Sequence, residues 1–235
     1  MIDKRNEKMT MPTQQTSAIS DQPRGERPNT DSYSVDRYAH NTAGQLAGNH
    51  HRAVAYSILA ALLRQSPGQE VLNIVSEMAD AVEQKDDLAI AMSMLGLSAR
   101  AATPAGLDDE YHALFIGIGR GELVPYGSWY LTGFLMEKPL VVLREDLSAM
   151  GYERNQATCE PEDHIAALCE VMALLINEAR NLDAQSDFFN AHIASWVDRF
   201  FIDLGDAKSA VFYRSVARFG KAFFDFEQQY LAMGE

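Results

Sequence analysis

Apolar residues recur every three or four positions along most of the chain from about Gln45 onward, which is the spacing of an amphipathic helix. Glycines, prolines and capping residues separate the periodic segments, as Pro67 and Gly68 do after the first of them. The predicted helices cover roughly residues 45–66, 71–82, 87–99, 105–115, 139–150, 161–181, 184–203 and 206–230. No alternating run is long enough for a sheet, so the sequence predicts an all-α, single-domain helical bundle without internal repeats.

The first 42 residues lack this pattern and are rich in polar and charged side chains. Such a segment buries too little apolar surface to offset its ordering entropy. We therefore expect a disordered N-terminal tail (1–42) followed by a helical domain (43–235). The first thirty residues contain no apolar core typical of a secretion signal, and no window approaches about eighteen consecutive apolar residues. These features predict a cytoplasmic protein that does not span a membrane.

Composition and charge narrow the class of partner. The chain has 47% hydrophobic and 23% charged residues and a formal net charge of −13, values of an ordinary globular protein with an acidic surface. Nucleic-acid binding requires concentrated lysine and arginine, so a nucleic-acid partner is not expected. The acidity favours basic ligands, although a solvated surface that aids solubility is its more ordinary explanation.

The two cysteines do not predict a disulfide framework. Cys159 and Cys169 stand ten positions apart at the start and in the third turn of one predicted helix, which places them about 15 Å apart, beyond the reach of a disulfide. We expect two free thiols, with Cys169 in the core. This agrees with a reducing compartment.

A polar cluster stands at the start of the same predicted helix. Pro161 suits the first helical position and Glu160 suits the cap, so that Glu162 and Asp163 lie in the first turn, where the helix dipole favours negative charge. Glu160 and His164 are four residues apart and are expected to meet near the exposed end. Carboxylates and an imidazole at a rigid helix mouth form either a recognition surface or a reaction site.

Three other readings of the chain remain open. A metal- or nucleotide-dependent enzyme could use Glu160, Asp163 and His164, but the chain has no paired Glu-x-x-His motif. For nucleotide binding, the candidate is the glycine-rich segment of residues 117–122. It follows a helix rather than a strand and lacks the Lys-Ser/Thr ending of a phosphate loop, which argues against that role. A helical adaptor could dimerise through an aromatic stripe, although packing within the bundle is the more ordinary role of such spacing. The stripe comprises Phe212, Val216, Phe219, Phe223, Phe226 and Tyr230.

Three ordered blocks of sequence resemble the TorD/DmsD family of redox-enzyme maturation chaperones. The first runs from Tyr111 to Gly119 and continues to Val124–Tyr130, and the second is Glu160-Pro161-Glu162-Asp163-His164. The resemblance spans roughly residues 50–232, with one departure: many relatives carry glutamate where this chain has Gly127. The third block is a set of C-terminal aromatic and neighbouring positions, Phe188, His192, Trp196, Phe200, Asp203, Leu204, Phe212, Tyr213 and Phe219.

The resemblance implies a cytoplasmic, non-enzymatic chaperone that needs no cofactor or metal of its own. Its partner would be the apo-form of a molybdopterin or tungstopterin oxidoreductase and that enzyme's twin-arginine leader, and a homodimer is possible. Carboxylates would bind the leader's arginines and an aromatic loop its apolar stretch. The expected peptide-binding residues are Leu123, Pro125, Tyr126, Ser128, Trp129, Glu160, Pro161, Asp163 and His164. We also expect the substitution Asp163→Ala to weaken leader binding with little effect on thermal stability.

Overall fold

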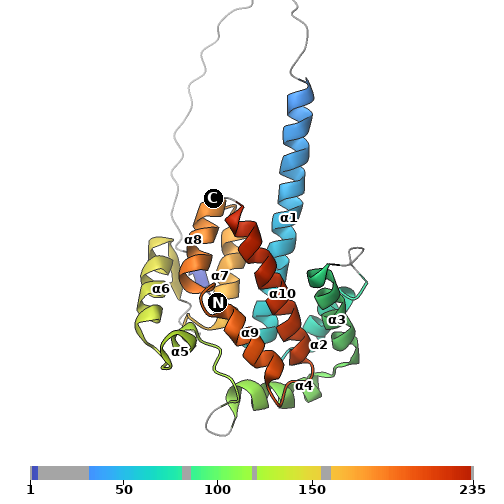
Figure 1. The fold of residues 1–235 in the computed structure, drawn as a ribbon, viewed down its shortest axis with the longest axis vertical. Coiled ribbons are helices and arrows are strands. Elements are labelled where there is room, and N and C mark those ends of the chain that lie inside the picture. Colours follow the sequence, from blue (N-terminus) through green and yellow to red (C-terminus); the bar gives the residue numbers. More distant parts are fainter. Residues whose placement is uncertain (1, 5–31, 81–85, 118–120, 155–159, 234–235) are drawn as a thin grey trace, which may run out of the picture.

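A computed structural model describes residues 2–4, 32–80, 86–117, 121–154 and 160–233 of the chain. The described residues form a helical bundle in which the N-terminal half of α1 extends beyond the body (Figure 1). The helices are α1 (Ser32–Arg64), α2 (Gln69–Glu77), α3 (Asp87–Ala101), α4 (Pro104–Tyr111), α5 (Gly127–Thr132), α6 (Lys138–Ala149), α7 (Ile165–Asn177), α8 (Leu182–His192), α9 (Val197–Asp206) and α10 (Tyr213–Ala232), with a π-helical turn at His112–Ile116.

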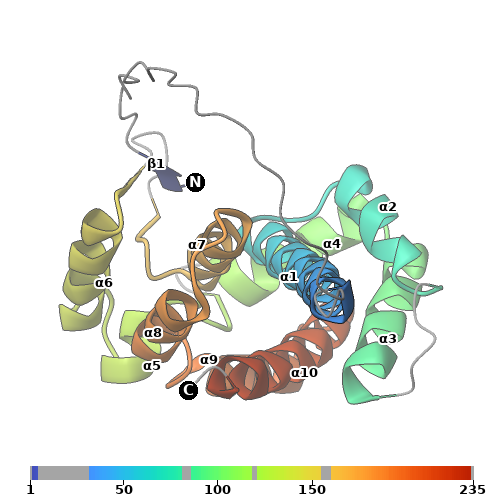
Figure 2. The same ribbon diagram turned by 90° about the horizontal axis from the view of Figure 1, so that it is seen from above.

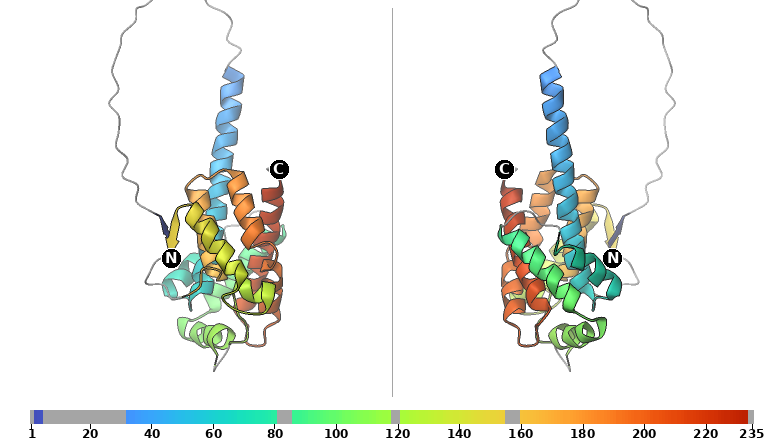
Figure 3. Two further views of the ribbon diagram at one scale, coloured as in Figure 1. Left: turned by 90° about the vertical axis from the view of Figure 1, so that its left-hand side faces the viewer. Right: turned by 90° about the vertical axis from the view of Figure 1, so that its right-hand side faces the viewer.

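The core is built around the paired helices α1 and α7, which make the most extensive contact between any two of the described elements (Figure 2). Helix α7 is almost wholly apolar and buried, so it is surrounded by other elements rather than lying on the surface. Helix α10 packs on α9 and α3, and α2 packs on α3. Helices α5 and α6 lie together on the opposite side of the body from α2 and α3 (Figures 2 and 3).

Local capping explains several helix boundaries. The side chain of Asp86 accepts a hydrogen bond from the N–H of Ala89 at 2.8 Å, which starts α3 where the sequence predicts. Thr103 caps α4 in the same way, with Pro104 at the first helical position. These boundaries depend on neighbouring residues alone, so the sequence can predict them.

The aromatic stripe of α10 packs within the bundle. Its residues Phe212, Val216, Phe219 and Phe223 are buried, while Phe226 is 40% exposed. Phe223 and Phe224 both meet Tyr56 of α1 edge to face. The prediction that this stripe belongs to the core is confirmed for these four positions.

Several sequence-based helix assignments are wrong. Helix α1 begins at Ser32 rather than near residue 45, and α10 begins at Tyr213 rather than near residue 206. The segment predicted as one helix over 184–203 is broken into α8 and α9 at residues 193–196, and the short helix α5 was not predicted. Helix α7 begins at Ile165 with His164 as its cap, not at Pro161 with Glu160 as its cap. Tertiary contacts cause this last difference, because residues 163–165 form backbone hydrogen bonds with another loop instead of the first helical turn.

A small two-stranded sheet accompanies the helices. Strand β1 (Ile2–Lys4) pairs antiparallel with β2 (Tyr152–Arg154), which lies between α6 and α7 along the chain. Strand β1 and the first turns of α1 fall inside the segment 1–42 that the sequence assigns to a disordered tail; residues 1 and 5–31 are outside the described part. Three-residue strands are too short to leave an alternating pattern in the sequence.

None of the helices in the described ranges is both long and apolar enough to cross a membrane by itself. The pair formed by Asp87–Ala101 and Pro104–Ile116 passes on length and composition only when joined, and the chain bends by 113° between its two halves.

Candidate peptide-binding site

Backbone hydrogen bonds join the two sequence blocks on which the site prediction rests. The N–H of Gly127 donates to the carbonyl of Asp163 at 2.9 Å, and the N–H of Ile165 donates to the carbonyl of Pro125, also at 2.9 Å. Tyr126 and His164 form an isolated antiparallel bridge between these bonds. The loop before α5 and the segment before α7 are therefore held together as one unit.

Asp163 is the most informative residue of this unit. Its side chain is only 4% exposed, and its Oδ2 accepts hydrogen bonds from the N–H of Ser128 at 2.8 Å and from the Ser128 hydroxyl at 2.5 Å. Its Oδ1 is buried and has no hydrogen-bond partner among the described residues. A buried carboxylate oxygen without a donor is costly, so a donor supplied from outside the protein would be bound favourably.

His164 has a structural task in this unit. It is 2% exposed, its Nδ1 accepts a hydrogen bond from the N–H of Ala166 at 3.1 Å, and its ring meets that of Tyr126 edge to face. Burial, aided by the positive charge of Arg64, lowers the pKa of His164 from 6.5 to about 3. The imidazole is therefore neutral near pH 7 and acts as an N-cap. The expected contact between His164 and Glu160 is replaced by an ion pair of Glu160 with Arg64.

This lowered pKa predicts how stability depends on pH. The folded protein disfavours the protonated form of His164. Below pH 6.5 this side chain is therefore protonated in the unfolded chain but not in the folded protein. We expect this residue to remove about 1.4 kcal/mol of unfolding free energy per pH unit as the pH falls from 6.5 towards 3. Urea unfolding at several pH values measures the slope. The variant His164→Asn keeps a capping oxygen without titrating, so its slope should be shallower; equal slopes would contradict this origin.

The other acidic residues of the helix mouth form ion pairs with nearby arginines. Arg64 Nη1 lies 3.7 Å from Glu160 and its Nε lies 2.8 Å from Glu170. Glu162, which is nearly buried, pairs with Arg144 of α6 at 2.8 Å between Nη2 and Oε2. The carboxylates of Glu160 and Glu162 thus lie beside protein cations, whereas Asp163 is bonded to a serine.

The remaining predicted binding residues fall into two groups. Leu123, Pro125 and Ser128 are buried, so they support the loop from inside. Tyr126, Trp129 and Pro161 are half-buried and offer part of their surface to a partner. Burial and the nearby charges of Glu160 and Asp163 raise the pKa of Tyr126 to about 12, so this side chain keeps its hydroxyl proton.

Gly127, the departure from the family pattern, is explained by its neighbour. A Cβ atom at this position would lie 3.3 Å from Nε1 of Trp196. That indole is buried and donates to the carbonyl of His192 at 2.8 Å. A glutamate at position 127 would therefore require Trp196 to shift.

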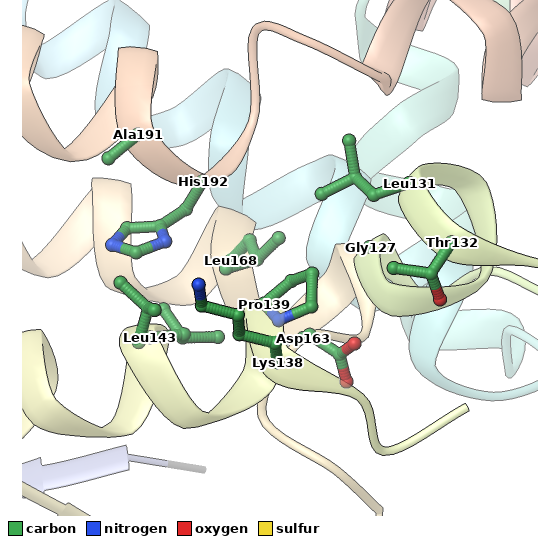
Figure 4. Close-up of a pocket in the computed structure, with 11 residues that line it drawn as sticks. Gly127, Leu131, Thr132, Lys138, Pro139, Leu143, Asp163, Leu168, Ala191 and His192 are labelled. Atoms are coloured by element: carbon green, nitrogen blue, oxygen red, sulfur yellow. The ribbon is translucent and has the colours of Figure 1, made fainter. Parts of the chain in front are cut away.

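A pocket of about 420 Å³ opens beside Asp163, between α5, α6, α7 and α8 (Figure 4). Sequence reasoning missed most of its lining, because the residues come from four separate elements. His192 is at its rim, where its Nε2 lies 2.8 Å from Asp146 Oδ2. Its walls are mostly apolar, and its charged lining residues are the buried Asp163 and the exposed Lys138. The lining residues are Gly127, Leu131, Thr132, Lys138, Pro139, Val142, Leu143, Asp163, Leu168, Ala191 and His192.

The described residues also bear on the alternative chemistries. Among them, no three histidine, cysteine, aspartate or glutamate side chains are grouped so that they could hold a metal ion. Cys169 is a free, fully buried thiol whose pKa is raised by burial, which confirms its place in the core. Cys159 and residues 118–120 of the glycine-rich loop lie outside the described part of the chain.

Comparison with known proteins identifies the family. A family model described as nitrate reductase delta subunit matches residues 73–202. The chain belongs to this family. It is similar to the TorD chaperone of Vibrio cholerae, with 28% identity over 186 residues that cover 74% of this chain and 77% of that protein. The TorD chaperone of Vibrio atlanticus is 27% identical over 208 residues, covering 79% and 97%.

One solved structure supports the fold of this TorD-like protein. A redox-enzyme maturation protein from Archaeoglobus fulgidus superimposes with a TM-score of 0.52 over 74% of this chain and 93% of that chain, at 20% identity. The all-α fold and the TorD/DmsD family predicted from the sequence are thereby confirmed. These relatives are named as chaperones or maturation proteins.

Proposed function

We propose that this TorD-like protein is a cytoplasmic chaperone that binds the leader peptide and apoprotein of a molybdenum- or tungsten-containing oxidoreductase. It would hold the client during cofactor insertion, before export or assembly, and would itself catalyse no reaction. The family and the chaperone names of its relatives support this role. The single observation that carries the leader-binding part is the buried Oδ1 of Asp163, which has no donor among the described residues and lies beside a mostly apolar pocket.

An arginine guanidinium is well suited to this position. It is planar, remains charged at any ordinary pH and donates several hydrogen bonds in a fixed geometry. The other oxygen of Asp163 is already held by Ser128, so the carboxylate is fixed in orientation before the peptide arrives. Such preorganisation lowers the entropic cost of binding.

The sequence-predicted residues take different parts in this proposal. Asp163 contacts the leader's arginine, and the half-buried surfaces of Tyr126, Trp129 and Pro161 contact its flanking residues. Glu160 adds negative charge at the edge, although Arg64 partly neutralises it. The buried residues act indirectly, by holding the loop and the start of α7 in place: Leu123, Pro125, Ser128 and His164.

The proposal is tested by titrating the full chain with two synthetic peptides in a calorimeter. One carries two adjacent arginines followed by a stretch of leucine and alanine, and in the other both arginines are replaced by glutamine. We expect the arginine peptide to bind more tightly by about tenfold or more at low salt, because a charge-assisted hydrogen bond is worth about 1.5–3 kcal/mol. The difference should shrink as salt is added. Equal affinities for the two peptides would refute leader recognition through an arginine.

A further inference from the structure

The segment that joins α5 to α6 exposes several large apolar side chains. Phe134 and Met136 are 68% and 70% exposed. Soluble proteins seldom leave so many large apolar side chains uncovered in one short segment unless it binds something. We call this surface the α5–α6 apolar turn, and its members are Leu131, Phe134, Leu135, Met136, Val141 and Val142.

The backbone of this turn is held in a defined conformation. Gly133 ends α5 in the left-handed region with φ of +82°. Met136 has φ of +60°, a backbone angle that residues other than glycine rarely adopt. The hydroxyl of Thr132 donates to the carbonyl of Ser128 at 2.8 Å and accepts from the N–H of Phe134 at 3.2 Å. These contacts tie the turn to Ser128, which in turn is bonded to Asp163.

The turn and the pocket share residues. Leu131 lines the pocket that Asp163 also lines (Figure 4). Val142 lines it too, and both Leu131 and Val142 belong to the α5–α6 apolar turn. An apolar surface therefore continues from the pocket onto the outside of the turn. A ligand that reached Asp163 with a basic group could lay an adjoining apolar segment along this surface.

We infer that the α5–α6 apolar turn binds the apolar stretch of the client's leader, next to the arginine bound at Asp163. This inference rests on the proposed function and extends it to residues that no sequence block marks. A leader suits the surface because it places basic residues directly before an apolar run, and here the carboxylate of Asp163 lies beside the apolar turn. The acidic net charge of −13 also favours a basic peptide over an acidic one.

The test combines Phe134→Ser with Met136→Gly in one variant. Both side chains are mostly exposed, and glycine is favoured at the positive φ of position 136, so the fold should remain intact. We expect affinity for the arginine-leucine peptide to fall about tenfold, because the variant removes two apolar contacts. A third peptide, in which serine replaces the leucines, should bind the variant and the wild type equally.

A matched control uses apolar side chains far from the site. Met94 and Leu97 on α3 are 43% and 58% exposed and lie on the opposite side of the body from α5 and α6 (Figure 3). The double variant Met94→Ser with Leu97→Ser should bind all three peptides as the wild type does. If the α3 variant weakened binding as much as the turn variant, general apolar adhesion would explain the effect and the inference would be overturned.

The remaining outcomes separate this inference from the proposed function. If the arginine peptide is preferred over the glutamine peptide but the turn variant binds normally, the inference fails and the function at Asp163 stands. If the turn variant weakens binding while the arginine and glutamine peptides bind equally, arginine recognition at Asp163 fails. The turn then binds apolar segments without an arginine partner. Absence of binding to every peptide would overturn both.

Discussion

Replacing Glu227 with alanine is expected to lower the free energy of unfolding by about 3–5 kcal/mol, the usual cost of removing one partner from a buried ion pair. Glu227 of α10 is fully buried and Arg52 of α1 is 3% exposed. The guanidinium donates to both carboxylate oxygens, at 2.6 Å from Nε and 2.9 Å from Nη2, and the Tyr56 hydroxyl donates to Oε2 at 3.0 Å. Alanine at 227 would leave Arg52 charged and without its carboxylate inside the protein.

The effect should be large because the other described contacts of Arg52 are with uncharged groups. Arg52 also lies over the ring of Tyr230 at 4.2 Å and donates to Asn49 at 3.2 Å, but neither contact supplies a negative charge. Helices α1 and α10 would lose the main polar contact that fixes them to each other, while the apolar packing of Tyr56 on Phe223 remains.

Chemical denaturation of the wild type and three variants tests this expectation. Tyr56→Phe should cost only about 1 kcal/mol, the net value of one hydrogen bond. The double variant Arg52→Met with Glu227→Leu removes both charges and should recover most of the loss, since apolar replacements of buried ion pairs are often tolerated. A Glu227→Ala variant that unfolds within about 1 kcal/mol of the wild type would show that water or another group compensates the arginine.

The helical architecture could be predicted from the sequence because it depends on local signals. Periodic apolar positions and caps such as Asp86 marked the helices, and the core role of Phe219 and Phe223 followed from their spacing. The break before α9 and the start of α7 at Ile165 could not be predicted in the same way. They depend on contacts between distant segments, such as the bond from Ile165 to Pro125, which leave no local trace.

The candidate site shows the same division. The two sequence blocks are indeed hydrogen-bonded to each other, but the sequence placed Glu160 and His164 together near the exposed end of the helix. In the structure His164 caps α7 and Glu162 pairs with Arg144, so burial and partners decide which groups are available. The α5–α6 apolar turn escaped prediction because apolar residues in a loop are read as core until exposure is known.

The prediction for Asp163→Ala also needs a correction. The sequence suggested that thermal stability would barely change, but Oδ2 accepts two hydrogen bonds from Ser128 in a buried environment. Alanine would leave both donors of Ser128 unsatisfied, so loss of binding could not be separated from loss of structure. Asparagine is the better substitution, because its oxygen can take the place of Oδ2 while the charge is removed.

The variant Asp163→Asn is expected to weaken binding of the arginine-leucine peptide by about 1.5–3 kcal/mol, or about 10- to 150-fold. The amide group of asparagine would replace the buried Oδ1 and face the incoming guanidinium with another donor. Wild-type affinity should fall as salt is added, because part of the attraction is between charges, and the variant should show a shallower fall. Calorimetric titration at two salt concentrations measures both quantities.

Ser128→Ala serves as the control for structural effects on the carboxylate. It removes the hydroxyl that donates to Oδ2 at 2.5 Å but keeps the backbone N–H bond and the charge of Asp163. We expect a modest loss of peptide affinity. The dependence of affinity on salt should match that of the wild type, since the carboxylate of Asp163 that contacts the arginine is still present. If Asp163→Asn instead matched the wild type in affinity and in salt slope, Asp163 would only hold the loop before α5 against α7, and the leader's arginines would bind elsewhere.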